Sequence, residues 1–143
     1  GRRGPAPAMS ILADLQRNPF MTQKVLVVDA SPTSRQQVRA ILSQAGYDMI
    51  EAVSGQEGLS LIASCAGLRL VMCDSALMDL PLASFVKQVS EVRGVNPPLP
   101  VLVLGREGQG SAWQQAKSAG AKAQVLKPLQ ASAVVAAVRA CAP

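Results

Sequence analysis

The sequence contains no histidine and very few aromatic residues. The absence of histidine excludes Ser-His-Asp and Cys-His catalysis, histidine metal sites and the pH switch that imidazole provides near neutrality. Because aromatics make up only 3%, a core must be built from aliphatic side chains, and a hydrophobic fraction of 49% supplies enough of them. The length of 143 residues is typical of one domain, so we expect a single packed core.

Long apolar runs and cysteine motifs are also missing. No apolar run reaches the roughly 18 residues that a membrane-spanning helix needs, so we expect no membrane association. Cys65, Cys73 and Cys141 form an odd set without CxxC or CxC spacing. We interpret them as small apolar residues rather than disulfide partners or metal ligands, which favours a reducing compartment, the cytoplasm.

The positive charge of the chain is mild and scattered. The formal net charge is +5, and three of the basic residues lie in the first 23 positions. Nucleic-acid binding calls for a basic face in which Lys and Arg cluster. We therefore expect no nucleic-acid binding by this domain.

Residues 1–23 differ in composition from the rest of the chain. A Gly/Pro/Arg stretch over 1–8 is followed by residues 9–17, where Ser10 could cap a short amphipathic turn. A native extension, a vector remnant and a docking helix all remain open for this part. The domain itself is expected over residues 24–143.

From Lys24 onwards, short apolar segments alternate with segments whose apolar residues recur at helical spacing. Gly46 and Gly120 mark two helix ends. This alternation predicts an α/β fold with parallel strands, right-handed crossovers and helices on both faces. The expected strands are 25–28, 47–53, 68–73, 101–104 and 123–126, and the expected helices are 32–45, a segment capped by Ser54, 82–92, 111–119 and 129–140.

Three charged residues follow expected strands directly, namely Asp29, Asp74 and Lys127. Ligands of open α/β sheets bind outside the carboxyl ends of the strands, so these side chains are expected to share one pocket. Two neighbouring carboxylates repel unless a cation intervenes, and Mg²⁺ is a natural cation for oxygen ligands. A phosphoryl group on a carboxylate would also need a positive charge, which Lys127 can supply.

The segments Val25–Ser31, Leu70–Asp74 and Val125–Pro128 resemble the signature segments of response-regulator receiver domains. The resemblance covers about residues 24–140. It implies a doubly wound, five-stranded parallel sheet of the flavodoxin-like order 2-1-3-4-5. It also implies a role in two-component phosphorelay signalling rather than an enzymatic one.

The resemblance assigns roles to four positions. Asp74 matches the aspartate that accepts a phosphoryl group from a histidine kinase. Asp29 matches one residue of the acidic pair that holds Mg²⁺, and the backbone carbonyl of Ala76 matches a further metal ligand. Lys127 matches the lysine that pairs with the phosphoryl group.

Other positions around this site depart from the family pattern. Ala30 replaces the second acidic residue, which should weaken Mg²⁺ binding. Gly105 replaces a Thr or Ser whose hydrogen bond to a charged group would contribute about 1.5–3 kcal/mol. The further departures are Arg106 in place of a small residue, Gln124 in place of the switch aromatic, Met78 in place of Pro, and Pro81–Leu82 in place of Asp-Gly.

Three hypotheses follow from this pattern. The first is a degenerate receiver, a protein-interaction module with weak or absent Mg²⁺ binding, in which Arg106 or Lys127 pairs with Asp74 in place of the metal. The second is a working receiver phosphorylated on Asp74. The third is a flavodoxin-like enzyme or nucleotide binder, for which the glycine-rich loop Gly105–Gly110 is the only support.

By resemblance, partners bind the face formed by residues 111–119, 123–126 and 129–140. A histidine kinase, an output domain, another signalling protein or a second copy of the chain would be the partner. Trp113 is expected to be either an exposed anchor or packed against Leu129. The residues expected on this face are Trp113, Gln114, Lys117, Lys122 and Gln124.

Overall fold

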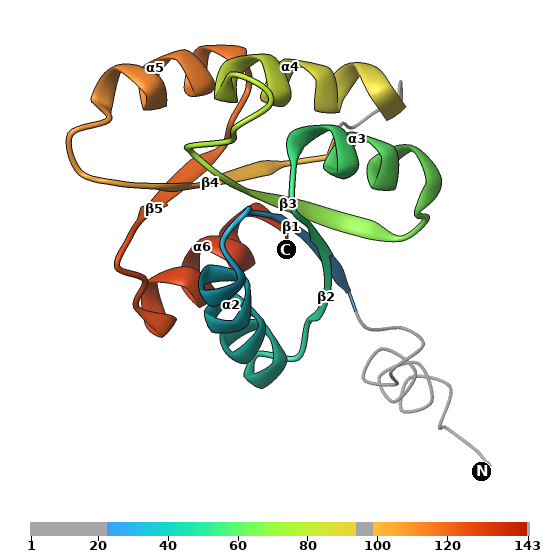
Figure 1. The fold of residues 1–143 in the computed structure, drawn as a ribbon. Coiled ribbons are helices and arrows are strands. Elements are labelled where there is room, and N and C mark those ends of the chain that lie inside the picture. Colours follow the sequence, from blue (N-terminus) through green and yellow to red (C-terminus); the bar gives the residue numbers. More distant parts are fainter. Residues whose placement is uncertain (1–22, 94–98, 143) are drawn as a thin grey trace, which may run out of the picture.

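The computed structural model describes residues 23–93 and 99–142. Within them, five strands alternate with five helices (Figure 1). The expected turn over residues 9–17 lies outside the described residues. In chain order the elements are β1 (Lys24–Val28), α2 (Pro32–Gln44), β2 (Asp48–Ala52), α3 (Gly55–Ser64), β3 (Leu68–Asp74), α4 (Leu82–Arg93), β4 (Val101–Gly105), α5 (Gly110–Ala119), β5 (Ala123–Leu126) and α6 (Ala131–Cys141).

All five strands belong to one sheet in the order β2-β1-β3-β4-β5, and every neighbouring pair is parallel. Helices α2 and α6 cover one face of the sheet, and α3, α4 and α5 cover the other (Figure 1). The structure thus confirms the expected fold class and strand order. The crossovers bring the carboxyl ends of all strands to one edge of the sheet.

The central strands are buried on both faces. In β1, Val25 and Val27 belong to the core under α2 and α6, whereas Leu26 and Val28 belong to the core under α3, α4 and α5. Burial on both faces explains why these strands are continuous apolar runs rather than alternating ones. Each such side chain contributes roughly 1.5–3 kcal/mol when it is fully buried.

Local signals place the helix ends. The Ser31 hydroxyl accepts a hydrogen bond from the Ser34 amide at 3.2 Å, and the Ser54 hydroxyl accepts one from the Glu57 amide at 3.1 Å. Gly46 and Gly120 adopt positive φ angles at the ends of α2 and α5, as expected for glycines that stop helices. Helix α6 begins at Ala131 rather than at residue 129, because the backbone of residue 130 is still extended.

The expectation that Trp113 packs against Leu129 is wrong. Trp113 is partly buried against the core under α3, α4 and α5, whereas Leu129 belongs to the core on the opposite face. The sheet therefore separates the two side chains. None of the helices in the described part of the chain is long and apolar enough to cross a membrane.

Candidate functional site

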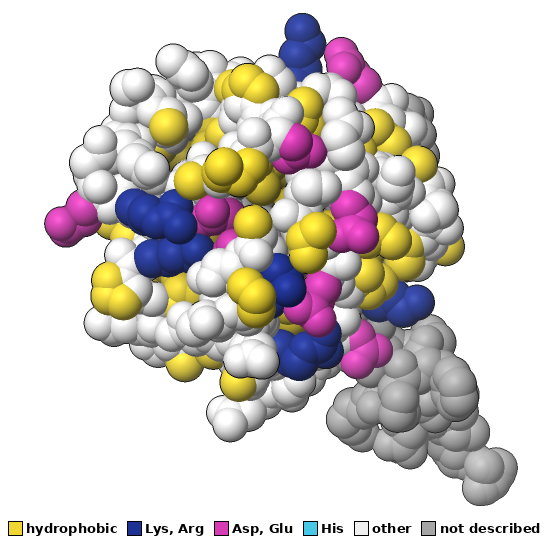
Figure 2. All heavy atoms as spheres, viewed as in Figure 1, with side chains coloured by type: hydrophobic (Ala, Val, Ile, Leu, Met, Phe, Trp, Pro, Cys, Tyr) yellow, Lys and Arg dark blue, Asp and Glu magenta, His cyan; other side chains and the backbone are white. Residues whose placement is uncertain are grey.

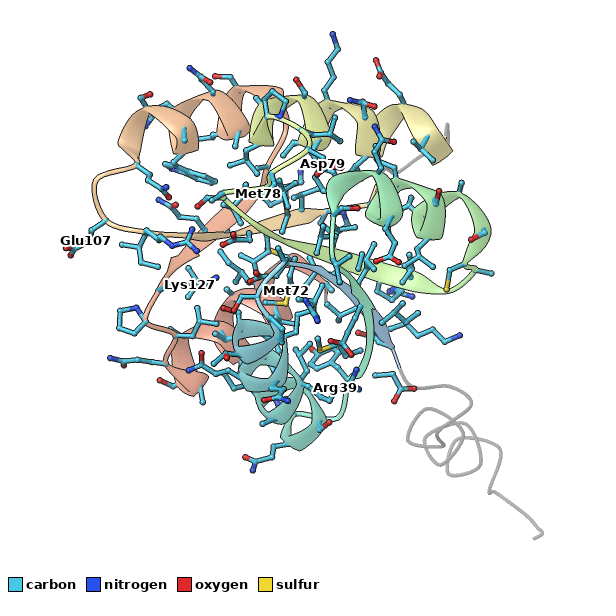
Figure 3. The ribbon with its side chains drawn as sticks, viewed as in Figure 1. Arg39, Met72, Met78, Asp79, Glu107 and Lys127 are labelled. Carbon is cyan, nitrogen blue, oxygen red and sulfur yellow. The ribbon has the colours of Figure 1, made fainter. Side chains whose placement is uncertain are left out.

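Asp29, Asp74 and Lys127 meet at the carboxyl edge of the sheet. Asp29 follows β1, Asp74 ends β3, and Lys127 follows β5. The carboxylates are buried, with 1% and 4% of their residue surfaces exposed. The Lys127 Nζ lies 3.0 Å from Asp29 Oδ2 and 3.0 Å from Asp74 Oδ1. Figure 3 shows Lys127 pointing from the end of β5 toward the central strands.

A second cation approaches the same pocket from the loop after β4. Arg106 Nη1 lies 3.2 Å from Asp74 Oδ1 and 3.3 Å from the Ser75 hydroxyl. The structure therefore places both cations that the sequence suggested within ion-pair distance of Asp74. With two carboxylates and two cations, the formal charges of the pocket cancel. Acidic and basic side chains lie close together on this face in Figure 2.

Each carboxylate oxygen of the pocket already has a protein donor. Asp29 Oδ1 accepts from the Ser31 amide at 2.9 Å, and Oδ2 accepts from Lys127. Asp74 Oδ1 accepts from Lys127, and Oδ2 faces the Ala76 amide at 3.4 Å. Hydrogen bonding of this kind compensates for the burial of the charges.

The donor set for a divalent cation is small. Ala30 is exposed and offers no side-chain oxygen next to Asp29. Among residues 23–93 and 99–142, no group of three or more acidic or cysteine side chains lies close enough to hold a metal. The oxygen atoms that the family resemblance assigns to a metal are those of Asp29, Asp74 and the Ala76 carbonyl, and both carboxylates face Lys127.

Gly105 and the Gln124 side chain lie next to each other. A Cβ atom at Gly105 would lie 2.5 Å from the Gln124 Oε1 atom, which is closer than carbon and oxygen can approach. The Gln124 amide therefore fills the space that a side chain at position 105 would need. By family resemblance these two positions would carry a hydroxyl and an aromatic ring, and here a glycine and an amide side chain lie in contact.

Sequence analysis missed two residues that shape the site. The Ser34 hydroxyl lies 3.0 Å from Lys127 Nζ and completes its set of partners. Asp79 accepts hydrogen bonds from the Gly55 and Gln56 amides at 2.9 Å, which ties the loop after β3 to the start of α3. These two amides lower the pKa of Asp79. The predicted cap at Ser31 places Ser34 in the first turn of the helix beside the pocket, which is a signal for its contact. No local sequence pattern predicts the contacts of Asp79.

Cys73 lies directly before Asp74 and is fully buried. Burial raises the pKa of its thiol, and the nearby charges of Asp74 and Asp29 raise it further. The thiol therefore stays protonated near neutral pH, which makes it a poor nucleophile. All three cysteines are free, with Cys65 and Cys141 only half-buried.

The expected partner face lies over α5, β5 and α6. Trp113 and Gln124 are half-buried on it. A groove of about 410 Å³ runs beside β5 and α6, and Leu126 at its edge is 42% exposed. The exposed members of the expected set are Gln114, Lys117 and Lys122.

The fold and the site together define a flavodoxin-like α/β domain with a pocket of paired aspartates and cations at the carboxyl edge of its sheet. The family model for the response regulator receiver domain matches residues 25–139. The chain belongs to the response regulator receiver domain family, as its sequence suggested.

Known relatives agree with this assignment. The chain is 29% identical over 121 residues to the chemotaxis protein CheY of Thermotoga maritima, which covers 82% of this chain and 96% of that protein. It is 30% identical over 122 residues to the response regulator MprA of Mycobacterium tuberculosis, which covers 84% of this chain and 50% of that protein. It superposes on a putative response regulator from Chloroflexus aurantiacus with a TM-score of 0.76 and 27% identity, covering 84% and 97% of the two chains.

The chain thus carries a receiver domain of two-component signalling. Such domains are signalling modules that typically bind Mg²⁺ at acidic residues, and response regulators work with kinases and output domains. The chain spans half of MprA and 23% of the transcriptional regulatory protein ZraR of Salmonella typhimurium.

Proposed function

We propose that this receiver is degenerate and acts as a protein-interaction module with impaired Mg²⁺-dependent phosphorylation of Asp74. One observation carries the proposal: Lys127 and Arg106 both lie within 3.2 Å of Asp74 Oδ1. The positive charge that a metal ion would supply is thus supplied by the protein itself. In this role Asp74 is a structural anion, and Ala30, Gly105, Arg106 and Gln124 are the positions that have lost the receiver pattern.

Electrostatics supports weak Mg²⁺ binding. An ion placed between Asp29 and Asp74 would face the ammonium of Lys127 at the same oxygens. Ala30 removes one negative charge that would otherwise offset this repulsion. Mg²⁺ also gives up its water shell reluctantly, so a neutral pocket offers little in exchange.

The phosphoryl group would also lack support. Gly105 has no hydroxyl to donate to a phosphoryl oxygen, and the loss of such a bond costs about 1.5–3 kcal/mol. Arg106 Nη1 lies 3.2 Å from Asp74 Oδ1, so it competes with a phosphoryl donor for that carboxylate. We infer that both phosphorylation and its detection are impaired.

The partner is proposed to be a protein that binds the face of α5, β5 and α6. This face carries exposed polar residues, the half-buried Trp113 and the groove beside β5 and α6, and such a mixture of polar and apolar surface suits a protein partner. A kinase, an output domain, another cytoplasmic signalling protein and a second copy of the chain all fit this description. The match to the receiver family weighs against a flavodoxin-like enzyme or nucleotide binder.

A working receiver is the alternative, and one observation favours it. Asp29, Asp74 and Lys127 keep the arrangement that phosphorylation requires by family resemblance, with Lys127 Nζ at 3.0 Å from both carboxylates. In that case Mg²⁺ and the phosphoryl donor would displace Arg106, whose side chain is 40% exposed.

Intact mass after incubation with acetyl phosphate and Mg²⁺ separates the two functions. The proposal predicts no added phosphoryl mass on the natural chain. It also predicts that the double variant Ala30→Asp, Arg106→Ala gains that mass, and that a further Asp74→Asn substitution removes it. Phosphorylation of the natural chain that is lost in Asp74→Asn and kept in the exposed control Asp48→Asn would contradict the proposal.

A further inference from the structure

The loop between β4 and α5 is joined to the end of β3 by a hydrogen bond that has no assigned role in the receiver pattern or in the charge balance of the pocket. Gln109 occupies the N-cap position of α5, but its side chain does not cap that helix. Instead, its Oε1 atom accepts a hydrogen bond from the Ser75 hydroxyl at 2.6 Å. Ser75 follows Asp74 directly, so this bond joins the end of β3 to the start of α5.

The same hydroxyl also faces the pocket. Ser75 Oγ accepts from Arg106 Nη1 at 3.3 Å, and that nitrogen is 3.2 Å from Asp74 Oδ1. A hydroxyl has one proton to donate and lone pairs to accept with, so Ser75 can serve both neighbours at once. The result is a continuous series of polar contacts that leads from the Asp74 carboxylate through Arg106 and Ser75 to Gln109.

In this series of contacts, the backbone of Ser75 is fixed to the sheet, whereas the backbone of Gln109 can adjust. The Ser75 amide donates to the Leu104 carbonyl at 2.9 Å, which fixes Ser75 on the sheet. On the helix side, the Gln109 carbonyl accepts from the Trp113 amide at 3.0 Å and forms the first turn of α5. Gly108, with φ of +84°, and Gly110 flank Gln109 and allow its backbone to adjust.

We propose that Ser75 and Gln109 are positioning residues that couple the Asp74–Arg106 ion pair to the first turn of α5. The inference rests on the proposed function in taking α5 as part of the partner face. A change in charge at Asp74 alters where Arg106 lies. The hydrogen bond that Arg106 donates to the Ser75 hydroxyl then changes, and with it the position of Gln109. Gly105 offers no hydroxyl at the end of β4. The hydrogen bonds through Arg106, Ser75 and Gln109 therefore connect the pocket to the partner face by a path that does not pass through positions 105 and 124.

Amide chemical shifts in the full chain test this coupling. Asp74→Asn neutralises the anion and is expected to shift the amide resonances of residues 109–113 and the indole of Trp113. In a Ser75→Ala or Gln109→Ala background the same substitution should shift them far less. A merely structural role of Ser75 would not produce this dependence of one substitution on another.

Two backgrounds serve as controls. Ser75→Thr keeps the hydroxyl and should keep the response. Ser90→Ala removes a serine of α4 that bonds within its own helix, to the Lys87 carbonyl at 2.7 Å, and should leave the response intact. Should Asp74→Asn not fold, Arg106→Gln perturbs the same ion pair from its exposed side and is expected to give the same pattern.

Equal shifts at residues 109–113 with and without the Ser75 hydroxyl would overturn the coupling, as would the absence of any shift in the natural background. The test needs neither Mg²⁺ nor a phosphoryl donor. Phosphorylation of the natural chain would therefore contradict the proposed function and leave the coupling standing, whereas equal shifts would remove the coupling alone.

Discussion

Two clusters of acidic and basic side chains lie on this domain, one in the pocket and one at the edge of β2. In the pocket, Asp29 and Asp74 are buried and face Lys127 and Arg106. At the edge, Glu51 bonds Arg35 at 2.8 Å and also pairs with Arg39, and both Glu51 and Arg39 are largely open to solvent.

The two clusters use the same chemistry but have different energetic consequences. Surface ion pairs contribute about 0–1 kcal/mol, because water and salt screen them and their side chains lose freedom. A buried charge that loses its partner destabilises a protein by about 3–5 kcal/mol, because nothing replaces the lost solvation. Burial therefore makes the stability of the domain depend strongly on the cations of the pocket. It depends much less on the arginines of the edge cluster.

Arg35 connects the two regions. Its Nη1 atom donates to the Asp29 carbonyl at 2.7 Å, while its Nε atom binds Glu51. The two arginines lower the pKa of Glu51, Arg39 more than Arg35. The edge cluster thus holds the backbone next to the pocket without taking part in its charge balance.

The largest effect is expected when the central cation of the pocket is removed. Lys127→Met should lower the free energy of unfolding by about 3–5 kcal/mol, because Asp29 and Asp74 then share a buried site without the ammonium between them. Urea unfolding at neutral pH measures this change. Since a domain has about 5–15 kcal/mol of stability in total, the variant is expected to be close to unfolding.

Lys117→Met is the matched control, because Lys117 is exposed on α5 and makes no ion pair among the described residues. Its effect should be within about 0.5 kcal/mol. Adding Asp29→Asn and Asp74→Asn to Lys127→Met should recover part of the loss. If Lys127→Met were as mild as Lys117→Met, the distinction between the two clusters would fail.

An intermediate effect is expected at Asp79, an exposed carboxylate held by backbone amides rather than by a cation. Asp79→Ala should destabilise the domain by about 1 kcal/mol, because the Gly55 and Gln56 amides at the start of α3 lose their acceptor. Chemical denaturation of the variant and of the natural chain at neutral pH gives this difference.

The contribution of Asp79 should depend on pH. Because hydrogen bonding lowers its pKa from the ordinary 3.8, its stabilisation is fully present above that value and is lost as the pH falls through the lowered pKa. The difference in unfolding free energy between the natural chain and Asp79→Ala should therefore shrink below pH 3.8. A difference that grows on acidification would show that another group is responsible.

The smallest effect is expected at Arg39. Arg39→Ala should cost no more than about 0.5 kcal/mol, since the pair with Glu51 is exposed. High salt should remove most of this difference, because the ions screen the pair. Thermal unfolding of both chains in low and high salt measures it, and a cost comparable to that of Lys127→Met would erase the contrast between the clusters.

Much of the fold was predictable because its signals are local. Apolar runs marked the strands, Ser31 and Ser54 marked helix starts, and Gly46 and Gly120 marked helix ends. The sheet order came from resemblance to the receiver family and is confirmed. Helix boundaries differed by one or two residues, as at the start of α6.

The pocket was predictable only in part. Position at strand ends is enough to bring Asp29, Asp74 and Lys127 together, because parallel strands share one carboxyl edge. The contacts of Asp79 and Ser75 depend on loop conformation, which no periodicity encodes, and the contact of the Gln124 amide with Gly105 depends on how β4 and β5 pair. Of the two expectations for Trp113, packing against Leu129 is wrong, because spacing along the chain does not reveal which face of the sheet a helix covers.

A Mg²⁺ titration followed by amide chemical shifts tests the central claim most directly. The natural chain should show no saturable shifts at residues around Asp29 and Asp74 in the low millimolar range. The double variant Ala30→Asp, Arg106→Ala, which restores a carboxylate and removes a cation, should saturate there. Saturation of the natural chain at low millimolar Mg²⁺ or below, centred on those two aspartates, would contradict the account.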